Sequence, residues 1–142
     1  MKYIQLIFLG LFFALIANSC KEEEDVYKTF PDPSWEVNDA IYSVNMTAVV
    51  KLPDYLVSYS QSDDKLAAFS DDDVCRGVGY IVDDLYFLTI KGTPEEEVNI
   101  KIRYYNKRNQ YMYITSDLFQ FEQDFVYGTA DEPMTLNFTV LK

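Results

Sequence analysis

Aspartate pairs at predicted turns are the first residues whose type and spacing could do chemistry. Asp63-Asp64 and Asp83-Asp84 flank short apolar runs, and a further acidic turn, Asp71–Asp73, lies between them. Alternate turns of a β-meander lie at the same end, so the two pairs could converge, and calcium takes about six to eight oxygen ligands. Aspartate is also a common turn residue, and EF-hand spacing is missing. We expect solvated turns, with a calcium site at Asp63, Asp64, Asp83 and Asp84 as the weak alternative.

A second candidate site is a basic and aromatic hairpin between residues 101 and 113. Four of the 12 Lys and Arg residues fall within positions 101–108 of a chain with net charge -11. If Ile100 and Ile102 face the core, the residues that alternate with them face outward. Tyrosine beside arginine and lysine is typical of binding surfaces for proteins or glycans, whereas a solvated sheet face is the alternative. The candidate binding face comprises Lys101, Arg103, Tyr105, Lys107, Arg108, Tyr111 and Tyr113.

Catalytic constellations are missing from the sequence. The chain contains no histidine, which excludes Ser-His-Asp and Cys-His units and any histidine-based metal site. Glycoside hydrolysis by two carboxyl groups needs one carboxyl with a raised pKa in a cleft, whereas most acids here lie in turns or near the N-terminus. We therefore predict that the protein is not an enzyme and that it needs no cofactor.

The first 20 residues have the pattern of an export signal. Lys2 supplies a positive start, residues 4–17 are largely apolar, and small residues precede Cys20. The apolar run is too short for a convincing spanning helix, which needs about 20 apolar residues. The terminal cysteine resembles the lipobox of bacterial lipoproteins, in which the signal is cut before a cysteine that then carries lipid. This resemblance implies a signal peptide at residues 1–19 and lipidation of Cys20; the alternative is an ordinary secretory signal.

The residues after Cys20 bear on location. Lys21, Glu22, Glu23 and Glu24, followed by Asp25, resemble the lysine-plus-acidic export tag of Bacteroidetes-type surface lipoproteins. The resemblance implies an outer-membrane protein that is lipid-anchored and exposed at the cell surface. A solvated charge run is the compatible alternative. Residues 20–34 carry two prolines and show no periodicity, so we expect an acidic tether there.

The alternation of apolar and polar residues after residue 34 sets the expected fold. Residues 42–51, 98–105 and 134–141 alternate with a period of two, and shorter apolar runs lie between turn signals. A helical stripe is missing from every window after the signal. This pattern predicts an all-β domain over residues 35–142, an antiparallel Ig-like β-sandwich of seven to nine strands.

The run Leu66–Gly79 contains Ala-Phe, an acidic turn and Cys-Arg-Gly, and Tyr-Phe-Leu follows in Tyr86–Gly92. These motifs resemble a module of secreted and surface proteins of Bacteroidetes-type bacteria, which implies an Ig-like sandwich in an adhesin-like or envelope setting. Gly77 and Gly79 predict a bulge or a close approach of two sheets. Arg76 is expected to pair with an aspartate of the turn, with a snorkelling surface arginine as the alternative.

Composition and charge complete the predicted function. A net charge of -11 disfavours nucleic acid as a partner, and Cys75 has no disulfide partner if Cys20 carries lipid, so we expect a buried, inert thiol. The sequence favours a cell-envelope lipoprotein that presents a non-catalytic β-sandwich for protein interaction or adhesion. The alternatives are a glycan-binding accessory lipoprotein that uses surface tyrosines and a purely structural envelope component. The expected partners are a membrane, through the lipid anchor, and a protein or glycan ligand.

Overall fold

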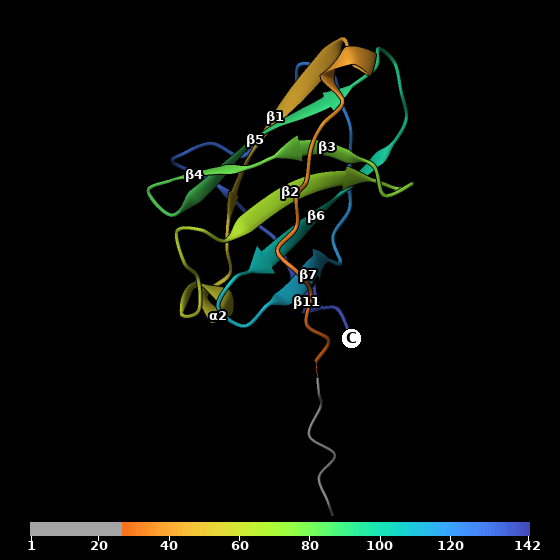
Figure 1. Ribbon diagram of the computed structural model, residues 1–142. Helices are drawn as coiled ribbons and strands as arrows, with labels where there is room; N and C mark the ends of the chain where they lie inside the picture. The colour runs from red at the N-terminus through yellow and green to blue at the C-terminus, as the bar shows by residue number, and fades with distance from the viewer. Residues whose placement is uncertain (1–26) are drawn as a thin grey trace, which may run out of the picture.

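The computed structural model describes residues 27–142, which form two β-sheets packed face to face (Figure 1). Two short helical segments accompany the sheets, the 3-10 turn η1 (Asp39–Ile41) and helix α2 (Asp54–Val57). The predicted signal peptide, Cys20 and the export tag at residues 21–24 lie outside the described residues. Among residues 27–142, no helix is both long and apolar enough to cross a membrane.

The first sheet is built around one long antiparallel pair. Its strands are β1 (Val44–Lys51), β4 (Tyr80–Val82), β5 (Leu85–Gly92), β9 (Val126–Tyr127) and β10 (Met134–Thr135). Strand β1 pairs with β5 along its whole length, and β4 pairs with the other side of β5, where it forms an edge of the sheet. Strands β9 and β10 run parallel to β1, which differs from the all-antiparallel prediction.

The second sheet has the order β11-β7-β6-β2-β3, with β8 also paired to β6. Its strands are β2 (Lys65–Ser70), β3 (Cys75–Val78), β6 (Asn99–Asn106), β7 (Tyr111–Thr115), β8 (Phe119–Gln120) and β11 (Phe138–Val140). The orders β1-β5-β4 and β7-β6-β2-β3 match the B-E-D and G-F-C-C′ strand orders of an immunoglobulin-type sandwich. The predicted all-β sandwich is therefore confirmed.

Eleven strands within the described residues replace the seven to nine expected, because two predicted strands each divide between the sheets. Residues 74–82, one of the shorter apolar runs that the sequence predicts as a single strand, become β3 and β4, and the chain changes sheet at Gly79. The run 134–141 becomes β10 and β11 in the same way. A Cβ atom on Gly77 would lie 2.5 Å from the backbone oxygen of Thr89 in the facing sheet, so the predicted close approach of two sheets is confirmed.

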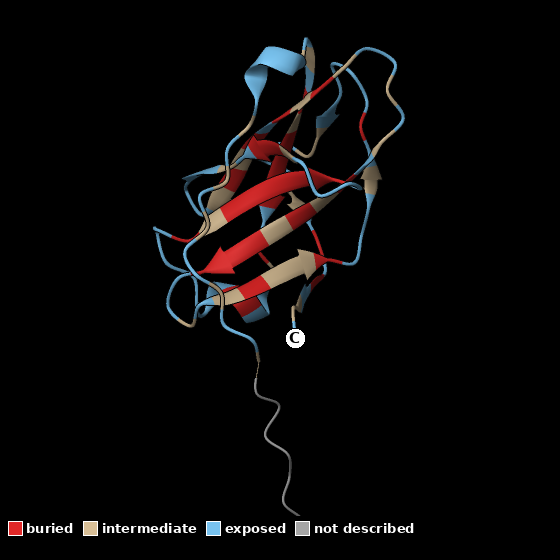
Figure 2. Cartoon of the chain, turned by 45° about the vertical axis from the view of Figure 1, so that its right-hand side comes forward, coloured by how far each residue is buried: buried red, intermediate tan, exposed pale blue. Residues whose placement is uncertain are grey.

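The core lies between the inner faces of the two sheets, to which strands β1, β2, β5 and β6 each contribute alternate side chains. Met46, Leu88, Ile90, Ile100 and Ile102 are all fully buried there. Strand β2 is buried on both of its faces (Figure 2). In a two-layer sandwich, a strand normally buries only the face that points to the core and exposes the other face to solvent. Something must therefore cover the outer face of the second sheet.

Candidate functional site

Residues 27–35, hereafter the strap, cover the outer face of the second sheet. The strap crosses β2, β6 and β7 in Figure 1. Its backbone pairs with the start of β7: Thr29 forms an antiparallel bridge with Tyr111, and the Phe30 N–H donates to the Gln110 carbonyl at 2.8 Å. The expected tether of residues 20–34 therefore does not describe residues 27–34, which belong to the packed domain.

Side chains fix the middle and the end of the strap. The Lys65 ammonium donates to the Pro33 carbonyl at 2.7 Å. The Trp35 ring packs edge-to-face on Phe69, with ring centroids 5.4 Å apart. This half-buried tryptophan lies on the outer face of the sheet, outside the core between the two sheets.

We call the outward-facing residues of the second sheet the covered face. The structure brings Lys101, Arg103 and Tyr105 of the predicted binding face together on this surface, as the alternation predicts. Tyr105 is nevertheless only 1% exposed, and its hydroxyl donates to the Phe30 carbonyl of the strap at 3.2 Å. The covered face comprises Ala67, Phe69, Lys101, Arg103, Tyr105 and Met112.

The two cations of the covered face share one carboxylate. Arg103 Nη2 lies 2.6 Å from Asp73 Oδ1, and Lys101 pairs with the same oxygen. The hydrogen bond from Lys101, with the charges of both cations, lowers the pKa of Asp73 below its ordinary value. The Arg103 guanidinium also lies 4.4 Å from the centre of the Phe69 ring. Both cations are thus already paired with a carboxylate of the chain itself, although the buried Arg103 Nε has no hydrogen-bond partner among the described residues.

The lysine at the hairpin tip, Lys107, is also paired with carboxylates of the chain itself. Lys107 Nζ lies 2.9 Å from Asp32 of the strap and 3.8 Å from Asp63. Asp32 also pairs with Lys65, and hydrogen bonds from Lys65 and Lys107 lower the pKa of Asp32. Arg108 is the remaining cation of the predicted face and is exposed in the turn.

The tyrosines of the predicted face do not lie side by side. Tyr113 pairs with Tyr104, so it faces the core side of the sheet, opposite to Tyr105. The cause is the four-residue turn between Asn106 and Tyr111, which places odd-numbered residues of β7 beside even-numbered residues of β6. The sequence pattern does not give this register, and Tyr105, Tyr111 and Tyr113 do not form the flat, exposed strip that would favour glycan binding.

The aspartate pairs have structural roles. Asp64 is buried, and its carboxylate accepts hydrogen bonds from the Tyr104 hydroxyl, the Asn106 amide and the backbone N–H groups of Gln61 and Lys107. Burial, followed by this hydrogen bond, raises the pKa of Tyr104.

Asp83 and Asp84 both have left-handed backbone conformations, with φ of 49° and 63°. They form the two-residue turn between β4 and β5, a geometry that aspartate tolerates. The described part of the chain contains no group of three or more His, Cys, Asp or Glu residues placed to hold a metal ion. The weak calcium alternative at Asp63, Asp64, Asp83 and Asp84 therefore has no support among residues 27–142.

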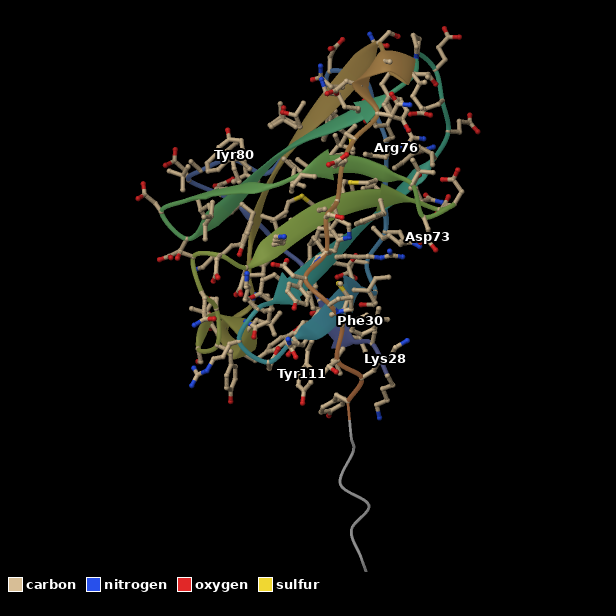
Figure 3. All side chains as sticks on the ribbon, viewed as in Figure 1. Lys28, Phe30, Asp73, Arg76, Tyr80 and Tyr111 are labelled. Carbon is tan, nitrogen blue, oxygen red and sulfur yellow. The ribbon has the colours of Figure 1, made fainter. Side chains whose placement is uncertain are left out.

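Arg76 neither pairs with an aspartate of the acidic turn nor lies at the surface, the two arrangements that the sequence predicts. Arg76 (labelled in Figure 3) is buried, and its guanidinium makes a bidentate pair with Glu96, at 2.9 and 3.3 Å. It also donates to the Lys91 carbonyl at 3.1 Å and lies over the Tyr42 ring. Arg76 contacts the acidic turn only through Ser70, whose hydroxyl accepts a hydrogen bond from Arg76 Nε at 3.2 Å.

Cys75 lies in β3 opposite Phe69 and is half-buried. Burial raises the pKa of its thiol, which keeps the sulfur protonated at neutral pH. This agrees with the expected inert thiol, although the residue is less buried than expected.

The outer face of the first sheet is a surface that the sequence patterns do not single out. Tyr80 is 61% exposed at the edge of this sheet (Figure 3), and its ring stacks on Phe87 with centroids 5.6 Å apart. The pairings Tyr80–Phe87, Thr89–Thr47 and Thr47–Val126 place these side chains on one face. We call this surface the open face; it comprises Thr47, Tyr80, Val82, Phe87, Thr89 and Val126.

The six residues of the open face are uncharged, and two lysines on the same side of the sheet, Lys51 and Lys91, lie at its two ends. Val82 and Val126 are about half exposed, like Tyr80. The available sequence signal is the apolar run that ends at Asp83-Asp84, and that signal is equally compatible with a buried strand.

Comparisons of the chain with protein-family models, with curated proteins and with solved structures find no match in any of the three.

Proposed function

We propose that this chain is a lipid-anchored, non-catalytic β-sandwich of the cell envelope that binds another protein through the open face. The observation that carries the proposal is the open face itself, on which Tyr80, Val82 and Val126 are exposed together with no charged residue between them. An exposed apolar patch of this kind is typical of protein–protein contact surfaces. The cations of the predicted binding face support the proposal by contrast, because Asp73 already engages Lys101 and Arg103 and Asp32 of the strap engages Lys107.

The proposed partner is a protein of opposite charge. A second copy of the chain is disfavoured because each copy carries a net charge of -11 and the copies repel one another. Asp83 and Asp84 are exposed beside Val82, so a partner with basic residues around an apolar centre complements this surface. The glycan alternative loses its support, because Tyr105 is buried and Tyr113 lies on the other side of the sheet.

The anchor and the location rest on the N-terminal residues. We propose that Cys20 carries the lipid and that Lys21, Glu22, Glu23 and Glu24 direct the protein to the outer face of the outer membrane. The substitution Cys20→Ser is expected to release the protein from the membrane fraction. Retention at the wild-type level would contradict the anchor. Replacing Glu22, Glu23 and Glu24 with Ala is expected to reduce cleavage by a protease added to whole cells.

Site-specific photo-crosslinking tests the open face. A photoreactive phenylalanine analogue replaces Tyr80 in the full chain, and a matched control replaces Leu118, which is 56% exposed away from the open face. We expect a discrete protein adduct from position 80 that is absent from position 118 and disappears with Val82→Asp. Identical adducts from both positions, or adducts that survive Val82→Asp, would contradict binding at this face.

A further inference from the structure

Both ends of the described chain lie at one end of the sandwich (Figure 1). The Tyr27 ring contacts Tyr111 at the start of β7, with centroids 5.5 Å apart, and the Lys142 ammonium lies 5.8 Å from the Tyr27 ring. Helix α2 lies at the same end, since the Asn106 amide donates to the Tyr59 carbonyl just after α2. We call this the terminal end; η1 and the start of β1 lie at the opposite end (Figure 1).

The chain available between the anchor and the domain is short. This step rests on the proposed lipidation of Cys20. Because the packed domain starts by Tyr27, only seven Cα–Cα steps separate the lipidated residue from it, a reach of about 25 Å at full extension. The eight residues of β1 alone span about 26 Å. The tether is therefore too short to bring the opposite end to the membrane while the terminal end points away.

The terminal end has the side-chain chemistry of a lipid-facing surface. Tyr55, Val57 and Tyr59 are each about half exposed on and beside α2. Lys28 and Arg108 are exposed at the same end of the sandwich, and Lys28 contacts the Phe30 ring. Tyrosine is enriched at membrane interfaces, and basic side chains bind lipid phosphates.

Acidic residues at the terminal end are partly neutralised. Asp32 and Asp63 pair with Lys65 and Lys107, whereas Asp54 in the first turn of α2 and Asp83 and Asp84 in the turn level with the end of β1 remain exposed acids.

The opposite end is acidic by comparison. Asp39, Glu95 and Glu97 are exposed there, and Lys91 lies 3.7 Å from Asp39. A lipid surface that carries phosphate groups attracts the basic residues of one end and repels the carboxylates of the other. Charge and tether length thus favour the same orientation of the domain.

We propose that the terminal end lies against the lipid surface that holds Cys20. Tyr55, Val57 and Tyr59 occupy the interfacial region, and Lys28 and Arg108 contact lipid phosphates. In this orientation the open face stands roughly perpendicular to the membrane and stays accessible to a partner. The acidic run at residues 22–25 is the competing occupant of the two cations, but it gives no reason for the exposed Tyr55, Val57 and Tyr59.

Photo-crosslinking to lipid tests the orientation with two matched serines. The photoreactive analogue replaces exposed Ser58, after α2, or exposed Ser43, at the opposite end. The lipidated mature chain is reconstituted in vesicles of phosphatidylethanolamine with a minority of phosphatidylglycerol, and lipid adducts are measured by mass. We expect at least about tenfold more lipid adduct from position 58 than from position 43, since each of the two basic residues adds roughly a fivefold factor near an anionic surface.

Two variants show whether lipid contact at position 58 depends on the side chains of the terminal end or only on the short tether. Val57→Ser combined with Arg108→Gln is expected to reduce the adduct from position 58 severalfold, whereas Val82→Ser on the open face leaves it unchanged. Equal adducts at positions 58 and 43, no response to the double variant, or a crosslink from position 58 to residues 22–25 in place of lipid would each overturn the proposal.

A separate measurement tests the proposed lipidation of Cys20. The mass of the mature chain from cells shows whether Cys20 carries lipid. If it does not, the proposed anchor fails, and coupling Cys20 to a maleimide lipid in a Cys75→Ser background still tests the orientation. Loss of binding at the open face affects neither measurement.

Discussion

The two outer faces of the sandwich differ in charge and in cover. The covered face holds Lys101 and Arg103, yet it is closed by the strap, and Tyr105 is almost inaccessible. The open face has an uncharged centre with Lys51 and Lys91 at its two ends, and Tyr80 projects from its edge. Basic and aromatic composition therefore marks, in this chain, the surface that binds the chain's own N-terminal segment. The surface left for another molecule is the one with the plainer composition.

The largest difference between the faces is expected from a matched pair of tyrosines. Tyr105→Ala removes a buried ring from beneath the strap and is expected to cost about 3–5 kcal/mol of unfolding free energy. Tyr80→Ala removes an exposed ring that contacts Phe87 and is expected to cost less than about 1 kcal/mol. Urea denaturation measures both variants. Equal losses would show that the strap does not shield the covered face.

A smaller difference is expected from two aspartates with left-handed backbones. Asp73→Asn leaves Lys101 and Arg103 without their shared carboxylate and is expected to lower the unfolding free energy by about 1 kcal/mol. Asp84→Asn, at the turn beside the open face, preserves the backbone preference and is expected to have almost no effect. Denaturation in low and high salt measures the pair, and the Asp73 effect is expected to shrink as salt rises.

The strap itself is expected to loosen in acid. Hydrogen bonds from Lys65 and Lys107 hold the pKa of Asp32 below its ordinary value of 3.8. A carboxyl whose pKa is lowered by folding stabilises the fold above the unfolded value, and this contribution is lost as the pH falls through the folded value. Below pH 3.8 we therefore expect the emission of Trp35, the chain's single tryptophan, to shift to the red.

Asp32→Asn controls the acid experiment, because it removes the titrating group from the strap. The variant is expected to show part of the red shift already at pH 7 and to lose the strap's contribution to the acid transition. An Asn variant whose Trp35 emission matches wild type at every pH would contradict a role for Asp32 in holding the strap.

The smallest effect on stability is expected for a polar substitution on the open face. Val82→Ser changes an exposed side chain at a sheet edge and is expected to alter the unfolding free energy by less than about 0.5 kcal/mol. The same change is expected to reduce the protein adduct from position 80. Ala67→Ser on the covered face is the matched control, since it buries a hydroxyl beneath the strap. A larger loss for Val82 than for Ala67 would reverse the assignment of the faces.

Period-two alternation was sufficient to predict most of the sheet structure. Residues 42–51 and 98–105 form β1 and β6 with nearly the expected bounds, because one of their faces is buried in the core. The alternation does not predict the two points at which the chain passes from one sheet to the other, at Gly79 and between β10 and β11. A strand that crosses between layers keeps its alternation, so no local pattern marks the crossing.

Long-range partners explain why the candidate site was only partly predicted. The alternation of apolar and polar residues predicts that Lys101, Arg103 and Tyr105 point outward. It does not predict that the strap covers the face on which they lie. The strap has no periodicity, and it is held by residues some eighty positions away, such as Gln110. Arg76 likewise meets Glu96, twenty positions on, in place of the adjacent turn.

The strap also determines how the domain responds to mechanical load. A pull directed along the chain from its N-terminal side reaches Tyr27 first, and the pairing of Thr29 and Phe30 with the start of β7 bears that force before the core does. Unfastening residues 27–35 would free a segment with a contour length of about 30 Å. Tension on the anchor would then be absorbed by extension of this segment while the two sheets stay packed.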